Sequence, residues 1–490
     1  GAVRIPTESY DSTRGVPPPP FPDPDPIHDG FPKLHKYLQD AFPLVHATLK
    51  RVVIQRYALL YTWEGSDPSL APLVLMSHMD TVPVLPDTLS QWIHPPFSGL
   101  IDEENDAIWG RGSVDTKPTL VGSLEAVEVL LSNGFVPRKT IYLAFGYDEE
   151  IAGREGARYV GQYMEEELEL VGKVGLVVDE GLDSLTSVDG LNLAVVNTAE
   201  KGYLDYHIEV QTPGGHSSIP PLHTGIGLMS QLVNALESHP FDVLLTKTNP
   251  YLGTVACKAE HSPDPDSFVR SALQNFDVKS KELAAYLAAL SLNDRYRMAS
   301  SQAIDIINGG LKVNALPERV TVDLNNRISI DSSIAEFQEI VLVNLLPVAT
   351  EFNLNFTFQD FLHPETLLGS RNASNAVGSV RVYKNPTDSP LEPSPVSPTS
   401  SAAWNMFEGT IHHVYERPVD GVAKRWIVSP GLMAGNTDTR YHWKMSENIL
   451  RFSPAMGGLG YHTVNERASI KGYMLAVTFF HELIRNYDEL

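Results

Sequence analysis

The sequence predicts an α/β fold, with a mainly parallel sheet interrupted by an inserted α+β segment that carries an antiparallel sheet. Between about residues 50 and 190, apolar runs alternate with helical patterns, which is typical of parallel sheets. From about residue 200, apolar and polar residues alternate, which is typical of half-exposed antiparallel strands. The 490 residues also exceed what one hydrophobic core usually holds, so we expect two or more domains.

The first part of the chain contains three continuous apolar runs, the pattern of strands that are covered on both faces. These predicted strands are residues 72–77, 140–146 and 174–181. Residues 116–134 form a predicted helix, because apolar residues recur at helical spacing, Pro118 suits a first turn and Gly134 suits a stop. A second helix is predicted over residues 156–172.

The inserted segment is predicted over residues 200–360. Strands are expected at residues 202–212, 319–330 and 353–360, and a helix is expected at residues 225–238. Residues 241–300 are long for such an insert, so we expect an extra subdomain there.

The first domain is therefore predicted to comprise residues 1–199 and 361–490. It would begin with a proline-rich arm at residues 16–26, because repeated prolines exclude both helix and central strand. A Pro/Ser-rich connection at residues 385–404 would precede an amphipathic helix at residues 472–487 that packs on the first sheet.

Composition excludes several classes of function. The formal net charge of −23 argues against binding to nucleic acid or to anionic membrane surfaces. The single cysteine, Cys257, permits neither an intrachain disulfide nor a cysteine-based zinc site. The sequence has no apolar run long enough to span a membrane. Sequons at Asn355 and Asn372 permit a vacuolar, secretory or extracellular location.

Acidic and imidazole groups follow each of the three parallel strands, and a further carboxylate lies between them. The groups are His78 and Asp80, then Asp148, Glu149 and Glu150, then Asp179 and Glu180, with Asp115 in between. Ligands of open α/β sheets bind at this edge. Converging carboxylates repel one another unless cations neutralise them. Oxygen and imidazole ligands suit zinc, with manganese or cobalt as substitutes, and the number of carboxylates favours two ions.

The residues themselves suggest a division of labour. Glu149 and Glu150 are adjacent, so their side chains leave the backbone in different directions, and one can bind metal while the other acts as a general base. Asp80 is two residues from His78 and is placed to accept a hydrogen bond from its second ring nitrogen.

Six motifs in order resemble the di-zinc exopeptidase and aminoacylase family, and they are nearest its fungal carboxypeptidase S (Gly-Xaa carboxypeptidase) branch. They read SHMDTVPV, WGRGSVDTK, FGYDEEIAGREGA, VVDEG, TPGGHSSIPP and GYHTVNE. The resemblance implies a phosphorylase/hydrolase-like catalytic domain with an inserted lid and two Zn²⁺ ions. His78 and Asp179 would bind one zinc, Glu150 and His462 the other, and Asp115 would bridge both before a cis peptide bond.

The resemblance also implies the catalytic roles. Asp80 would orient His78. Glu149 would be the general base and then the proton donor to the leaving amine. His216 would stabilise the oxyanion, often in the site of a neighbouring subunit, so a homodimer is expected. Arginine suits a substrate carboxylate. The expected substrate-binding residues are Arg440, Arg327, Asn314 and Gly435.

The implied activity is hydrolysis of the amide next to a C-terminal amino acid, in short peptides of the Gly-Xaa type. An N-acyl-amino-acid hydrolase or synthase is the alternative within the same chemistry. A catalytically dead binding module would lack a ligand or the base, yet every expected position holds a competent residue. A serine-hydrolase reading of GHSS fails, because Ile219 stands where the second glycine of a nucleophile elbow is required.

Overall fold

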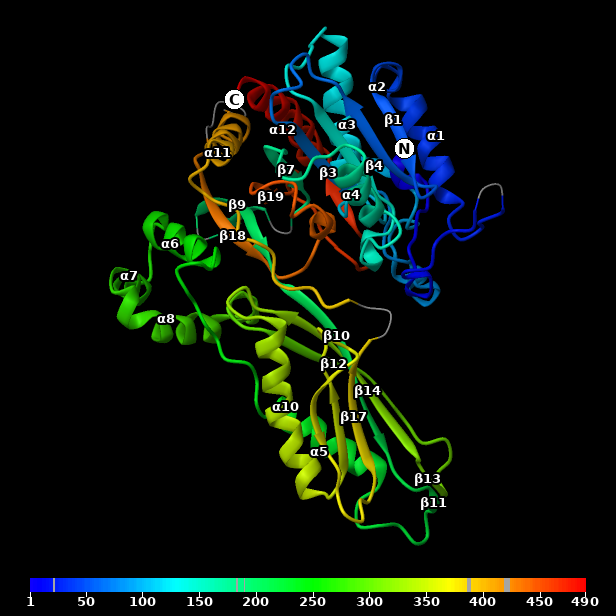
Figure 1. The fold of residues 1–490 in the computed structure, drawn as a ribbon. Coiled ribbons are helices and arrows are strands. Elements are labelled where there is room, and N and C mark those ends of the chain that lie inside the picture. Colours follow the sequence, from blue (N-terminus) through cyan, green and yellow to red (C-terminus); the bar gives the residue numbers. More distant parts are fainter. Residues whose placement is uncertain (21–22, 182–183, 189, 386–388, 418–423) are drawn as a thin grey trace.

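The computed structural model describes residues 1–20, 23–181, 184–188, 190–385, 389–417 and 424–490. It confirms the predicted fold class: a large α/β domain stands above a separate domain built on an antiparallel sheet (Figure 1). Parts of the predicted proline-rich arm (residues 21–22) and of the Pro/Ser-rich connection (residues 386–388) lie outside the described residues.

A nine-stranded sheet forms the centre of the large α/β domain, which the sequence predicts to be the catalytic domain, in the order β1-β2-β6-β3-β7-β19-β9-β18, with β8 paired to β9. Its inner strands β6, β3, β7 and β19 run parallel, and antiparallel pairs flank them. The strands are β1 (Lys50–Ile54), β2 (Ala58–Trp63), β3 (Leu73–His78), β6 (Ile141–Gly146), β7 (Leu176–Asp179), β8 (Leu185–Val188), β9 (Leu191–Glu200), β18 (Trp426–Met433) and β19 (Ile449–Arg451).

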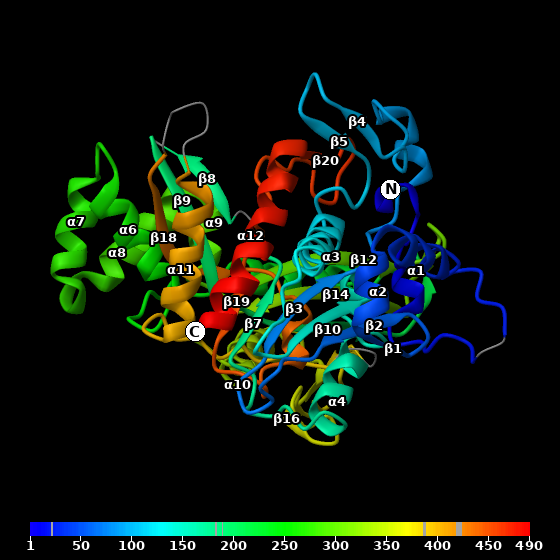
Figure 2. The same cartoon turned by 90° about the horizontal axis from the view of Figure 1, so that it is seen from above.

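Helices cover this sheet on both faces. Figure 2 shows α3 and α12 side by side on one side of the central strands, and α4 on the other. One continuous apolar core joins these layers. The helices are α1 (Gly30–Ala41), α2 (Pro43–Thr48), α3 (Lys117–Ser132), α4 (Ala157–Glu166), α11 (Ala402–Tyr415) and α12 (Ile470–Glu489). A small sheet joins β4 (Leu100–Asp102), β5 (Ala107–Trp109) and β20 (Arg467–Ser469).

The lid domain is a six-stranded sheet in the order β12-β14-β10-β17-β15-β16, with α5 (Gly225–Glu237) and α10 (Ile334–Glu351) packed on it over a separate core. Its strands are β10 (Gly202–Gln211), β12 (Ser301–Gly309), β14 (Arg319–Ile328), β15 (Asn355–Gln359), β16 (Leu367–Arg371) and β17 (Ser379–Lys384). A two-stranded ribbon of β11 (Gly215–His216) and β13 (Ala315–Leu316) lies at the tip of the lid (Figure 1).

The lid extends further along the chain than the predicted boundary at residue 360. Strand β17 pairs with β10 at the centre of the lid sheet, so the chain returns to the catalytic domain only after Lys384. The return strand pairs with the outgoing one, because the backbone groups of Tyr203 and Leu391 exchange hydrogen bonds at 2.8 Å. We therefore correct the boundary: residues 361–384 belong to the lid.

The predicted extra subdomain region holds the helices α6 (Tyr251–His261), α7 (Ser267–Gln274), α8 (Phe276–Leu290) and α9 (Leu292–Tyr296). These helices pack against the catalytic domain. Their core includes Ala199 and Leu432 of the large sheet. The Thr254 hydroxyl also donates to the backbone oxygen of Pro430 on β18 at 2.6 Å.

Candidate metal centre

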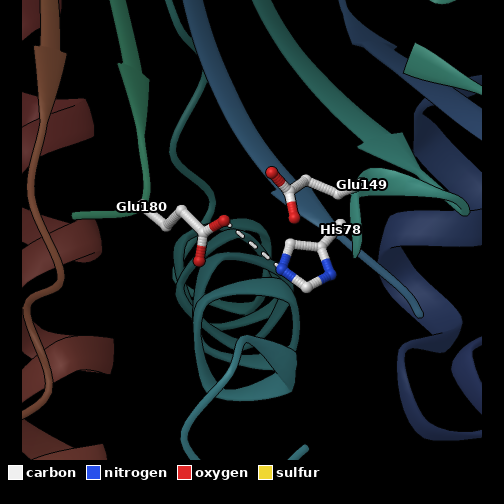
Figure 3. A group of neighbouring side chains, drawn as sticks. All are labelled: His78, Glu149 and Glu180. Carbon is white, nitrogen blue, oxygen red and sulfur yellow. Dashed lines mark ion pairs between the residues drawn. The ribbon is translucent and has the colours of Figure 1, made fainter. Parts of the chain in front are cut away.

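The ends of three parallel strands bring their polar side chains to one point. His78 is the last residue of β3, Glu149 opens the short turn after β6, and Glu180 follows β7 (Figure 3). Parallel neighbours end at the same edge of a sheet, which is why residues 70 to 100 positions apart meet here.

Two histidines share one carboxylate. The Nε2 atom of His78 lies 3.1 Å from Asp115 Oδ1 and 3.3 Å from Glu180 Oε1. The Nε2 atom of His462 lies 3.0 Å from Asp115 Oδ2 and 3.1 Å from Glu150 Oε2. Asp115 thus presents one oxygen to each histidine, and the peptide bond that follows it is cis. This is the arrangement of two adjoining ligand sets around a bridging carboxylate.

Asp80 lies behind these groups and is fully buried. Its Oδ1 atom lies 3.3 Å from His78 Nδ1 and accepts the backbone N–H of Glu149 at 3.1 Å. Its Oδ2 atom accepts the backbone N–H of Glu150 at 3.2 Å. The carboxylate therefore holds the backbone of both adjacent glutamates, while His78 Nδ1 makes a hydrogen bond to the backbone oxygen of Asp80 at 3.1 Å.

Asp179 does not take the place expected of it. Its Oδ1 atom accepts the backbone N–H of Glu180 at 2.8 Å, and its Oδ2 atom is buried without a hydrogen-bond partner among the described residues. Successive side chains of an extended strand leave on opposite sides, so of two adjacent acids only one faces the cluster. That residue is Glu180 (Figure 3), and we correct the predicted ligand accordingly.

His462 reaches the cluster from a loop more than 300 residues along the chain from Asp115 and Glu150, the two residues that it contacts. Its backbone φ of 53° lies in the left-handed region, which is uncommon outside glycine. The same loop supplies Glu466, a fully buried residue that sequence reasoning missed. Glu466 Oε1 accepts the backbone N–H of Val114 at 2.9 Å and of Asp115 at 3.3 Å, so it holds the bridging carboxylate in place. Only its presence in the GYHTVNE motif pointed to it.

A pocket of about 370 Å³ opens over the cluster, between the catalytic domain and the lid. Three of the four predicted substrate-binding residues line it: Arg327 from β14, and Gly435 and Arg440 from the segment after β18. Arg327 Nη1 donates to Asn436 Oδ1 at 2.6 Å, and its guanidinium lies over the ring of Tyr203. The pocket is thus lined by four carboxylates (Asp115, Glu149, Glu150 and Glu180) and by three arginines (Arg14, Arg327 and Arg440).

The other predicted contacts are not brought into this pocket. His216 and Asn314 are exposed on the ribbon at the tip of the lid, far from the metal ligands (Figure 1). His216 Nδ1 makes a 2.8 Å hydrogen bond with Ser218 Oγ in the same turn. Within one chain, therefore, His216 does not serve the site, and the homodimer stays a prediction.

Comparison with known proteins decides the family. Residues 74–486 match the family model described as peptidase family M20/M25/M40. The chain belongs to the M20 peptidase family. Carboxypeptidase S of Saccharomyces cerevisiae is 39% identical, with all of this chain and 83% of that protein aligned. An N-fatty-acyl-amino acid synthase/hydrolase of Bos taurus is 30% identical, and the alignment covers 100% of this chain and 86% of that protein.

Solved structures support the same M20 fold. Human carnosine dipeptidase 1 matches with a TM-score of 0.63 at 14% identity, covering 100% of this chain and 94% of that one. An M20 metallo-carboxypeptidase of Sulfolobus solfataricus matches with a TM-score of 0.63 at 17% identity, covering 100% and 98%. The chain is thus an enzyme of a metallo-carboxypeptidase family. Within the described residues, no helix has the length and apolarity needed to cross a bilayer.

The electrostatics of this M20 site call for cations. Burial, with repulsion from Asp115, raises the pKa of Glu150 to about 7. Burial likewise raises the pKa of Glu180 to about 7, against the opposing effect of His78. Burial raises the pKa of Glu149 well above its ordinary value, with Glu180 and Asp438 adding repulsion. Carboxylates packed this closely ionise together only when a positive charge is placed among them.

The donor set fits divalent metals. Ligand atoms about 2.0–2.1 Å from a tetrahedral zinc lie roughly 3.3 Å apart, and the four imidazole–carboxylate separations here are 3.0–3.3 Å. His78, Asp115 and Glu180 would hold one ion, and Asp115, Glu150 and His462 the other. His78 Nδ1 is held by Asp80, which leaves Nε2 as the metal-facing nitrogen.

Proposed function

We propose that this protein is a metal-dependent carboxypeptidase that hydrolyses the amide bond before a C-terminal amino acid, in dipeptides or short peptides of the Gly-Xaa type. The observation that carries the proposal is the shared pocket. Glu149, four of the proposed metal ligands, Arg327 and Arg440 all line it. A substrate carboxylate held by the arginines would present its neighbouring amide to Glu149.

The residues of the chain divide the work of hydrolysis. Two divalent ions, zinc in the first instance and Co²⁺ or Mn²⁺ as substitutes, would polarise the scissile carbonyl and make the attacking water more acidic. Glu149 would take a proton from that water and pass it to the leaving amine nitrogen. Asp80 would keep Glu149 in place through the hydrogen bond to its backbone N–H.

The alternative is hydrolysis or synthesis of N-acyl amino acids, favoured by the relative from Bos taurus. Both functions need a free carboxylate on the amino acid, and they differ in what lies on the acyl side of the amide. The vacuolar lumen or secretory pathway stays the predicted location for either one.

A substrate panel tests the proposal. We expect Gly-Xaa dipeptides to be hydrolysed, with activity lost on treatment with 1,10-phenanthroline and restored by Zn²⁺. Dipeptides with an amidated C-terminus should lose about 100-fold or more in kcat/KM, because the half-buried Arg327 and Arg440 are then left without their anion. Faster turnover of N-fatty-acyl amino acids than of any dipeptide would establish the alternative. Chelator-resistant hydrolysis, or none at all, would contradict both.

A further inference from the structure

The first residues of the chain lie directly against the loop that carries Asp80. The backbone N–H of Thr81 donates to the carbonyl of Thr7, and that of Ser9 donates to the carbonyl of Thr81, each at 3.0 Å. The Thr7 hydroxyl also donates to the Met79 carbonyl at 2.7 Å. Residues 7–9 therefore form a short parallel bridge, between Glu8 and Thr81, to the segment that follows β3.

A buried lysine fixes the same segment at a second point. Lys117, two residues after the bridging Asp115, is buried, and its Nζ donates to the carbonyl oxygens of Ile5 at 2.8 Å and Ala2 at 3.3 Å. The segment is thus tied to the two loops that supply His78 and Asp115. The segment is therefore held in place by residues that neighbour the candidate metal ligands.

Ser9 completes the hydrogen bonds of Asp80. Its hydroxyl donates to Asp80 Oδ2 at 2.7 Å, which is shorter than the backbone bonds from Glu149 and Glu150 to the same carboxylate. The other acceptor within reach of this hydroxyl is the Tyr147 carbonyl, at 3.4 Å, so the single proton goes to Asp80. Ser9 and Asp80 are 3% and 0% exposed, so water does not readily substitute for the missing donor.

We propose that Ser9 is a positioning residue of the metal centre, acting through Asp80. This inference rests on the proposed function. The Ser9 hydroxyl holds the Asp80 carboxylate in the orientation that faces His78 Nδ1 on one side and the Glu149–Glu150 backbone on the other. Without the Ser9 hydroxyl, Asp80 Oδ2 accepts only the backbone N–H of Glu150, in a site that water does not reach. The carboxylate then turns to find a second hydrogen-bond donor. A turn of the Asp80 carboxylate would release the backbone N–H groups of both glutamates and the Oδ1 contact with His78, leaving the imidazole with its hydrogen bond to the Asp80 backbone oxygen.

Metal affinity and metal spectroscopy test this. We expect Ser9→Ala to lower Zn²⁺ affinity about 10-fold in competition with a chromophoric chelator, the lower end of the range for groups behind a ligand. The visible absorption bands of the Co²⁺-loaded protein should shift. Ser9→Thr, which retains a hydroxyl, should restore both values. The matched control is Thr7→Val, which loosens the same segment but removes a bond to a carbonyl rather than to Asp80. It should lower the melting temperature and leave metal affinity within about 2-fold.

A double-mutant cycle separates action through Asp80 from general loosening. In an Asp80→Asn background, Ser9→Ala should cause no further loss of Zn²⁺ affinity beyond about 2-fold. Equal losses in Ser9→Ala and Thr7→Val, additive effects in the cycle, or unchanged affinity in Ser9→Ala would each overturn the inference and leave the proposed function standing. A wild-type protein that binds no metal would instead remove the proposed function, and this inference with it.

Discussion

Replacing Glu149 with glutamine should lower kcat by about 10²- to 10⁴-fold while the protein still binds its metals, because the change removes the proton-accepting oxygen and keeps the shape. The structure places the Glu149 side chain near His78 and Glu180, and ties its backbone to Asp80. Steady-state kinetics on a Gly-Xaa dipeptide and metal analysis of the same preparation check both halves of this expectation.

The neighbouring residue provides the control. Glu150 lies 3.1 Å from His462 Nε2, so Glu150→Gln should lose metal affinity as well as activity. The two adjacent glutamates are thus expected to behave differently: Glu149→Gln should lose turnover and keep its metals, whereas Glu150→Gln should lose both turnover and metal affinity. Full turnover in Glu149→Gln would contradict its role as the base. Loss of metal in Glu149→Gln would make it a ligand instead.

Replacing Glu180 with glutamine should lower the affinity of the site for zinc by about 100-fold or more, because it removes a charged ligand rather than a group behind one. The matched change Asp179→Asn should cost less than about 10-fold, since the carboxylate of Asp179 is engaged with the backbone N–H of Glu180. Chelator competition on the two purified variants measures the difference.

The two outcomes distinguish the ligand sets. A larger loss in Asp179→Asn than in Glu180→Gln would restore the ligand predicted from the sequence and overturn the one drawn from the structure. Equally small losses of zinc affinity in the two variants would show that neither residue is a metal ligand. Burial and repulsion from Glu200 raise the pKa of Asp179 to about 6, so its ionised form costs stability at pH 7, and Asp179→Asn should raise the melting temperature of the metal-free protein.

Much of the fold and part of the site follow from local patterns in the sequence. Continuous apolar runs predict the strands β3, β6 and β7. Because ligands bind at the carboxyl ends of parallel strands, the sequence also predicts that His78 and Glu149 lie close together. The choice between Asp179 and Glu180 did not follow, because it depends on the backbone direction at the last residue of β7 rather than on composition.

Long-range contacts account for the rest. Glu466 contacts Asp115 and Ser9 contacts Asp80 across roughly 350 and 70 residues, and no local pattern predicts either contact, although Glu466 lies in the GYHTVNE motif. His462 was recognised by resemblance alone, since a histidine in a loop has no periodic signal. The predicted end of the lid, at residue 360, lies too early in the chain. The missed strand, β17, is six residues long and pairs with β10, about 170 residues before it, so no local pattern assigns it to the lid.

Anomalous diffraction at the zinc edge, from crystals of the metal-loaded protein, tests the central claim most directly. We expect two peaks about 3.5–4 Å apart, the spacing of two-metal hydrolytic sites. One should contact His78, Asp115 and Glu180, and the other Asp115, Glu150 and His462. Absence of any peak among these side chains, or a peak ligated by Asp179 in place of Glu180, would contradict the account.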